Sequence, residues 1–283
     1  LGGENVFRHY TQAVDGETTR RRAESFKNHY LQARMFWLSM SPVEAEHIVA
    51  AFAFELGKVE VPEIRAAVVD QLNRVDNDLA GQVAAKLGLP APSEVAVDQV
   101  APSPALSMIK PNDSIATRKI AILAADGVDV EGTQQLIDAL REYGAIPEVL
   151  APVAGGALTG GSGGELPVDR ALVTAASVLY DAVVVPCGPD AIATLSEDGL
   201  ALHFVTEAFK HHKTVAAFGA GIDLLRRAGI PSELAEDTDV LNDQGVVTTT
   251  AAAADLGDEF INEFVAGLAQ HRNWERMTDP IPA

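Results

Sequence analysis

The sequence has little of what a secreted or membrane-spanning protein needs. Its 283 residues include one cysteine, Cys187, so no disulfide can form within the chain and a reducing, cytoplasmic location is expected. No apolar run approaches the roughly eighteen residues of a membrane span, and no basic region followed by an apolar core opens the chain. The residues therefore predict a soluble protein without a membrane segment or a secretory signal.

Basic residues are also scarce. Lys and Arg number 21 against 40 Asp and Glu, which gives a formal net charge of −19. The imbalance is uneven, because residues 1–90 have a net charge of −2 and residues 91–283 a net charge of −17. A strongly acidic domain repels a phosphate backbone, so nucleic acid is not expected among the partners.

The first third of the chain predicts an arm, a helical domain and a linker. Residues 1–25 lack periodicity, and residues 26–89 have helical spacing of apolar residues. Ser41 as N-cap, Pro42 at the first helical position and Glu44 three residues after the cap predict a helix that ends at Gly57. A second helix is expected to run unbroken from about Pro62 to the Gly-Leu-Pro at 88–90. The Pro- and Ser-rich residues 90–117 indicate an extended linker.

From residue 118 to 283, apolar strands alternate with helices. Strands are expected at KIAILAA, IPEVLAP, DAVVVPCG, TVAAFGA and GVVTTTA. Helices are expected between them, including one over ALVTAASVL (residues 171–179) and a closing helix over 252–277, while the glycine-rich 155–164 indicate a flexible loop. The alternation predicts an α/β fold: a doubly wound, flavodoxin-like parallel sheet, preceded by the small all-α domain.

The strand ends, where such folds bind ligands, contain little recognisable chemistry. The turn after the first strand contains Asp126, Asp129 and Glu131, which would repel a flavin phosphate. The glycines of GGALTGGSGG do not open a helix directly, so they do not make a dinucleotide fingerprint. No spacing typical of a zinc site occurs, and no metal or cofactor is expected on this chain.

Two strand ends are candidates for the position at which α/β enzymes place a nucleophile. In KTVAAFGAGIDLL a buried strand turns into a helix, and the elbow position holds Gly219, followed by Ala220. Cys187 follows the strand VVVP, but no histidine can be assigned to it from the sequence, so a plain buried cysteine is expected.

These segments resemble the class I glutamine amidotransferase-like superfamily, in which the elbow reads roughly A-A-I-C-x-G. The resemblance places the missing nucleophile at Gly219 and the histidine that often follows it at Ala220, while Asp129 or Glu131 matches the acidic residue of the first turn. A fold that kept its shape and lost its covalent chemistry is therefore expected.

A closer resemblance is to large-subunit heme catalases. The segment RRRAESFKNHYLQARMFWLSMSPVEAEHIVAAFAFELGKV resembles the end of their wrapping region and their α-helical domain, and DAVVVPCG and HRNWERMTDPIPA resemble their C-terminal domain. In that family the heme ligand is a tyrosine in an Arg-x-x-x-Tyr setting; Tyr10, Tyr30, Tyr143 and Tyr180 have no such setting here. With Leu1 as first residue, the chain is expected to be the C-terminal part of a longer catalase.

The resemblance implies a function for the parent polypeptide and a supporting role for this part. The parent would use heme to convert hydrogen peroxide to water and oxygen, and this chain would stabilise the subunit and the tetramer and shape access channels, without activity of its own. Its partners would be the heme-barrel domain and the other subunits. Two alternatives remain: a free-standing, chaperone-like module that binds unfolded clients, and a residual hydrolase or isomerase that uses Cys187 or an acidic group.

Overall fold

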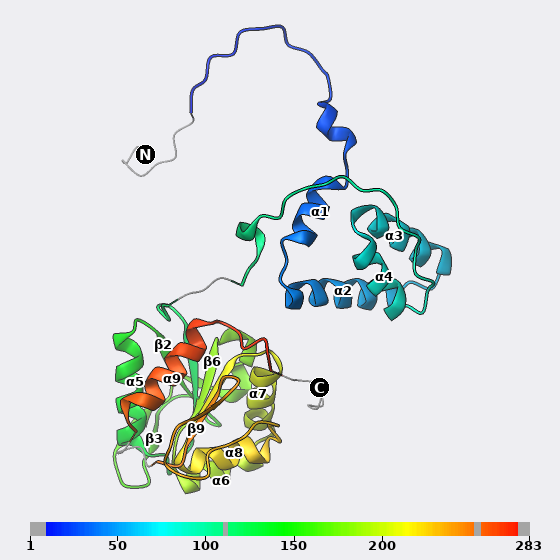
Figure 1. Ribbon diagram of the computed structural model, residues 1–283. Helices are drawn as coiled ribbons and strands as arrows, with labels where there is room; N and C mark the ends of the chain where they lie inside the picture. Colours follow the sequence, from blue (N-terminus) through cyan, green and yellow to red (C-terminus); the bar gives the residue numbers. More distant parts are fainter. Residues whose placement is uncertain (1–9, 110–112, 252–255, 277–283) are drawn as a thin grey trace. The chain divides into compact units, whose positions relative to one another are not determined.

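The computed structural model describes residues 10–109, 113–251 and 256–276. The chain divides into two compact units, Leu1–Ile109 and Lys110–Ala283, which we call the helical unit and the sheet unit (Figure 1). None of the helices within the described residues is both long enough and apolar enough to cross a membrane.

The helical unit contains four α-helices. They are α1 (Leu31–Leu38), α2 (Pro42–Gly57), α3 (Pro62–Val75) and α4 (Asn77–Lys86), preceded by the 3-10 turn η1 (Glu24–Lys27). Before η1, residues 10–23 are extended and exposed. The predicted capping box at the start of α2 is confirmed: the Ser41 hydroxyl accepts from the backbone N–H of Glu44, whose carboxylate accepts from the N–H of Ser41.

The expectation of one unbroken helix from Pro62 to the glycine at 88 is wrong. The helix stops at Val75, Asp76 takes an extended conformation, and α4 begins at Asn77. The Asp76 carboxylate accepts from the N–H groups of Asp78 and Leu79, which makes it the N-cap of α4. An aspartate that caps competes with the continuous helix that its apolar neighbours favour.

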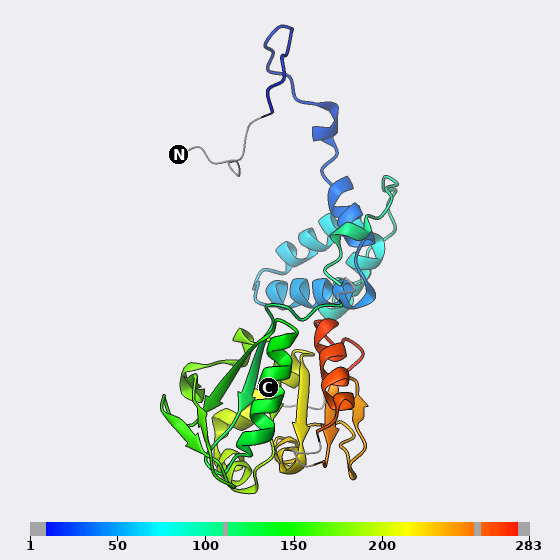
Figure 2. The same ribbon diagram turned by 90° about the vertical axis from the view of Figure 1, so that its left-hand side faces the viewer.

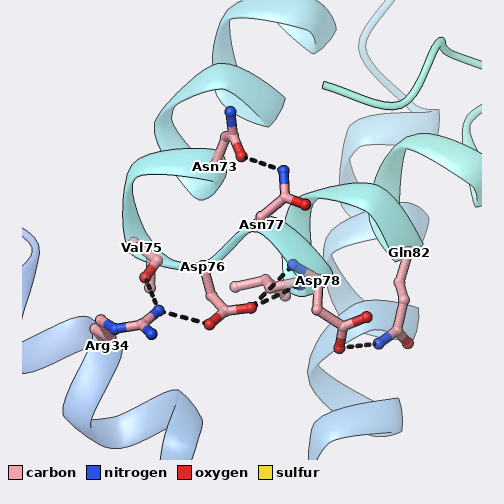
Figure 3. A network of polar contacts seen from close by, with 8 residues as sticks. Arg34, Asn73, Val75, Asp76, Asn77, Asp78 and Gln82 are labelled. Atoms are coloured by element: carbon pink, nitrogen blue, oxygen red, sulfur yellow. Dashed lines mark hydrogen bonds and ion pairs between the residues drawn. The ribbon is translucent and has the colours of Figure 1, made fainter. Parts of the chain in front are cut away.

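Asp76 also fixes α1 to this break (Figure 3). The Arg34 guanidinium Nη1 on α1 lies 2.6 Å from Asp76 Oδ2 and 3.0 Å from the carbonyl oxygen of Val75. Both charged side chains are mostly buried, with 13% and 12% of their surface exposed. One aspartate therefore ends α3, starts α4 and holds α1 against them.

The segment after α4, residues 90–109, is held to the helical unit by side-chain hydrogen bonds. Asn73 Nδ2 donates to the carbonyl oxygen of Ser93. Further along, the Glu44 carboxylate accepts from the hydroxyl of Ser107 and the N–H of Met108. Residues 90–109 have no regular structure apart from the 3-10 turn η2 (Pro104–Leu106), and these side chains fasten them to α2 and α3.

The sheet unit has a seven-stranded sheet with the order β5-β2-β1-β6-β7-β9-β8. Its strands are β1 (Lys119–Leu123), β2 (Ile146–Ala151), β5 (Arg170–Ala171), β6 (Ala182–Val185), β7 (Thr214–Phe218), β8 (Leu241–Asp243) and β9 (Val246–Thr249). All neighbours pair parallel except β8 and β9. The central order β2-β1-β6-β7-β9 is that of a flavodoxin-like doubly wound sheet, which confirms the predicted fold class.

Helices cover both faces of this sheet (Figure 1 and Figure 2). One face packs on α5 (Val130–Glu142) and α9 (Asp258–Ala269), where Phe260 and Phe264 meet the buried Phe218. The other packs on α6 (Pro189–Glu197), α7 (Gly199–Lys210) and α8 (Ile222–Arg227). Strands buried on both faces explain why their sequences are continuous apolar runs.

Three local expectations in this unit are wrong. Residues 171–179 do not form a helix: they complete β5 and form the 3-10 turns η3 (Leu172–Thr174) and η4 (Ser177–Leu179). The glycine-rich segment is an antiparallel hairpin of β3 (Ala157–Thr159) and β4 (Glu165–Pro167), whose Leu158 and Leu166 are buried in the core. The closing helix is shorter than 252–277, of which residues 252–255 and 277 lie outside the described part, and residues 270–276 form a tail after α9.

Candidate functional site

The turn from β7 into α8 has the backbone of an elbow. Gly219 follows the last residue of β7 with φ of +54°, a left-handed conformation that favours glycine. The 3-10 turn η5 (Gly219–Gly221) then leads directly into α8. A Cβ at Gly221 would lie 2.2 Å from the carbonyl oxygen of Val185, so the elbow packs tightly against the end of β6.

The structure brings Gly219 and Cys187 together. A Cβ built on Gly219 would lie 2.6 Å from Cys187 Sγ. Cys187 is half-buried and comes two residues after the end of β6, the neighbour of β7 in the sheet. The sulfur of Cys187, at the end of β6, thus fills the space next to Gly219, at the end of β7.

Asp129 joins this corner through its backbone, whereas Glu131 does not. The N–H of Asp129 donates to the carbonyl oxygen of Cys187, at 2.9 Å. The Asp129 carboxylate accepts from the N–H of Gly132 and caps α5, so it supports the helix. Glu131 is exposed in the first turn of α5. Ala220, half-buried in η5, supplies only a methyl group.

Three of the histidines in the sheet unit lie near the N-terminal ends of the strands, opposite to the end that holds Cys187. His211 and His212 immediately precede Lys213 and β7, and His271 follows α9, while Cys187 follows the C-terminal end of β6. A nucleophile and its base must lie within hydrogen-bond reach, so these residues form no such pair with the thiol. Among the described residues, no group of three or more His, Cys, Asp and Glu side chains is arranged to hold a metal ion.

A polar network that no sequence motif indicated joins β1, β2 and β5. Glu148 on β2 lies 2.7 Å from Lys119 Nζ and 2.9 Å from Arg170 Nε, and it accepts from the hydroxyl of Tyr180. Burial and the hydrogen bond to Glu148 raise the pKa of Tyr180. Burial alone would raise the pKa of Glu148, but the hydrogen bonds from Lys119 and Tyr180 outweigh it and lower that pKa. The phenol, which lies between η4 and β6, therefore remains a hydrogen-bond donor to Glu148.

The tail after α9 is anchored by a buried arginine. Arg276 is 4% exposed, and its guanidinium donates to the carbonyl oxygens of Phe209, Lys213 and Gln244. Burial lowers its pKa to about 10. The segment that follows α9 is thereby fixed against the N-terminal end of β7.

The helical unit has an apolar groove of about 500 Å³ that is lined almost wholly by carbon. Phe36 and Trp37 of α1 and Ile48 and Phe52 of α2 line it, together with side chains of α3 and α4. Phe36 is 46% exposed and Phe52 is 36% exposed. We call this feature the aromatic groove. Exposed apolar surface of this kind indicates an interaction site.

Comparison with known proteins matches each of the two units to a protein family. Residues 116–278 match the family described as the C-terminal domain found in long catalases, and residues 23–87 match the family described as catalase-related immune-responsive. The chain belongs to the long catalases. The confirmed resemblance covers both the helical unit and the sheet unit.

Individual long catalases align with nearly all of the chain. Catalase HPII of Mycobacterium avium is 68% identical over 100% of this chain. Catalase-2 of Bacillus subtilis is 35% identical over 96% of it, and catalase C of Rhizobium meliloti is 41% identical over 84%. The chain spans between 34% and 40% of the lengths of these long catalases.

Proposed function

We propose that this chain serves as the C-terminal portion of a heme catalase that converts two molecules of hydrogen peroxide to two of water and one of oxygen. Within that polypeptide the chain stabilises the subunit and its tetramer, shapes the access channels and performs no peroxide chemistry itself. The heme-barrel domain and neighbouring subunits are its partners, in the cytoplasm. The similarity to long catalases over the whole chain supports this proposal.

The tyrosines of this chain do not fit a heme-ligand role. The hydroxyl of Tyr180 donates to Glu148, and that of Tyr30 donates to Gln71. Tyr143 lies 3.5 Å from Asn262, and Tyr10 is 89% exposed on the extended segment. In the proposed parent polypeptide, heme would therefore be held by residues outside this chain.

The observation that carries the supporting role is the aromatic groove. Burying apolar surface contributes about 25 cal/mol per Å², so a groove lined by Phe36, Trp37 and Phe52 favours a packed partner. In the proposed assembly that partner is the heme-barrel domain of the same polypeptide. The sheet unit, whose own core is closed on both faces, then follows as an added domain.

A blot of source-cell extract with antibody against this chain tests the proposal. We expect a band far above the 29.9 kDa of the chain that co-migrates with heme and peroxide activity. A single band near 29.9 kDa without heme would contradict it. In a second test, hemin is added to the purified chain, and restored peroxide turnover would overturn the assignment of catalysis to the rest of the polypeptide.

The aromatic groove also serves the alternative of a client-binding module. Suppression of a model client's thermal aggregation at substoichiometric amounts, lost in Phe52→Asp, would favour that alternative. The residual hydrolase is less favoured, because the sulfur of Cys187 is packed at Gly219 and His211, His212 and His271 lie at the other edge of the sheet. Only an activity that is lost in Cys187→Ser would restore it.

A further inference from the structure

Positive charge collects at the N-terminal edge of the acidic sheet unit. Arg118 immediately precedes β1, Lys213 immediately precedes β7, and His271 and Arg272 follow α9. We call these four residues the basic edge cluster. They stand out because residues 91–283 carry a net charge of −17.

The sheet and the tail bring the four residues together. β1 and β7 both pair with β6, so the residues just before these strands lie on the same edge. Arg118 Nη1 lies 3.1 Å from the carboxylate of Asp181, the residue before β6. The N–H of Asn273 donates to the carbonyl oxygen of His212, which places Arg272 beside Lys213.

The charges in this cluster are not balanced by the contacts that its members make. Asp181 is shared between the Arg118 guanidinium and the N–H of Lys119. Lys213 is 3% exposed, and its ammonium donates to a neutral carbonyl oxygen, that of Ser177, at 2.5 Å. Within the described part of the chain, Arg272 makes no ion pair and donates to the carbonyl oxygen of His271.

Burial, with like charge as a smaller cause at Lys213 and His271, lowers the pKa values of the cluster. Burial and then the charge of Arg272 lower the pKa of Lys213 to about 8, although Asp181 and Glu207 act in the opposite direction. Burial also lowers the pKa of Arg272, with Arg118 adding to the effect and Asp181 opposing it. Burial and the charge of Arg272 lower the pKa of His271. An anion held at this edge would offset the burial of these cations and the like charge that Arg272 adds to Lys213 and His271.

We propose that the basic edge cluster is a binding site for a phosphate-type oxyanion, with the Arg272 guanidinium as the principal donor and Arg118 as the second. A guanidinium presents several N–H donors in a planar fork that matches two oxygens of such an anion. Lys213, which lies beneath the surface, adds charge without touching the ligand. The site lies at the N-terminal ends of the strands, opposite to the end that holds Cys187 and Gly219, so it is separate from the elbow.

Titration calorimetry of the 283-residue chain with sodium phosphate at pH 7 tests the site, with ionic strength held constant by sodium chloride. We expect saturable binding that weakens at least tenfold in Arg272→Gln and less in Arg272→Lys, which keeps the charge and loses the fork. Arg226→Gln is the matched control, because Arg226 belongs to the same unit and pairs with Asp223 at the surface of α8. This control is expected to bind phosphate like the wild type.

A second arm with adenosine monophosphate distinguishes the source of the anion. Tighter binding of the ester assigns a phosphate ester, and binding of phosphate alone assigns the free ion. Three results would overturn the proposal. They are heat that does not saturate, equal phosphate affinity of the wild type and Arg272→Gln, and a sodium chloride titration that gives the same heat as the phosphate titration. If Arg272→Gln loses the circular dichroism of the fold, Arg118→Lys replaces it, since it keeps the charge facing Asp181 and removes a fork.

Discussion

The sulfur of Cys187 occupies the space that a side chain at position 219 would need. A Cβ on Gly219 would lie 2.6 Å from Cys187 Sγ, a distance that requires a shift, and 3.0 Å from Cys187 Cβ, which is tighter than most real contacts. The two residues belong to neighbouring strand ends, and each restricts what the other position can hold. A nucleophile at the elbow and a cysteine at 187 are therefore incompatible in this packing.

We expect Gly219→Ala to destabilise the sheet unit by about 2–4 kcal/mol, because it combines a left-handed backbone with a steric conflict. In a Cys187→Ala background the conflict is eased, and the cost of Gly219→Ala should fall by about 1–2 kcal/mol. Denaturant unfolding of the four proteins of this cycle measures the coupling. Gly229→Ala is the control, since Gly229 has φ of +70° and open space where its Cβ would lie. Additive effects of the two substitutions would contradict the packing described.

Asp76 is expected to be the most sensitive polar residue of the helical unit. Asp76→Ala removes the N-cap of α4 and leaves the Arg34 guanidinium buried without its carboxylate, so we expect a loss of about 3–5 kcal/mol. Asp76→Asn keeps a capping oxygen and should lose about 1–3 kcal/mol. The exposed pair Arg74–Asp70 supplies the control: Asp70→Asn should change stability by less than about 0.5 kcal/mol. Equal effects of Asp76→Asn and Asp70→Asn in urea unfolding would contradict the role of Asp76.

The fastening of the segment after α4 should depend on the ionisation of Glu44. Burial alone would raise the pKa of this carboxyl, but hydrogen bonds from the N–H groups of Ser41 and Met108 and from the hydroxyl of Ser107 lower it to about 2, from an ordinary 4.5. A depressed carboxyl pKa stabilises the fold above pH 4.5, and this contribution is lost as the pH falls towards 2. The stability gap between wild type and Glu44→Gln should therefore close over that range. The gap for Glu46→Gln, a change at an exposed neighbour on α2, should not vary in the same way.

The five central parallel strands of the sheet unit could be predicted because each is a continuous apolar run followed by a turn, whereas the short β3, β4, β5 and β8 could not. The capping box at Ser41 could be predicted because all its parts lie within four residues. The break at Asp76 could not, since the apolar spacing continues through it and only the contact with Arg34 shows that this aspartate faces inward. At residues 171–179 a helix was expected, but the chain pairs β5 with β2 and turns twice to reach β6.

The candidate site was predictable only in part. The elbow at Gly219 follows from a strand, small residues and a helix in succession, a local pattern. Its contact with Cys187 depends on the parallel pairing of β6 with β7, and the two residues are 32 positions apart in the chain. The buried Lys213 and the contact between Arg118 and Asp181 likewise arise from strand register and carry no sequence motif.

Lys213 should make the stability of the sheet unit rise in alkaline solution. Its folded pKa of about 8 lies below the ordinary 10.5, so the unfolded chain binds more protons between these values and stability increases with pH across that window. After allowance for solvent screening, we expect the stability of the wild type relative to Lys213→Met to rise by roughly 1–2 kcal/mol from pH 8 to pH 10.5. Other titrating groups, Tyr180 among them, are present in both proteins and cancel in the difference. Lys210→Met changes a partly exposed lysine on α7. The difference in stability between the wild type and this variant should stay constant from pH 8 to pH 10.5. A flat difference for Lys213→Met as well would mean that the Lys213 ammonium is not desolvated beneath Ser177.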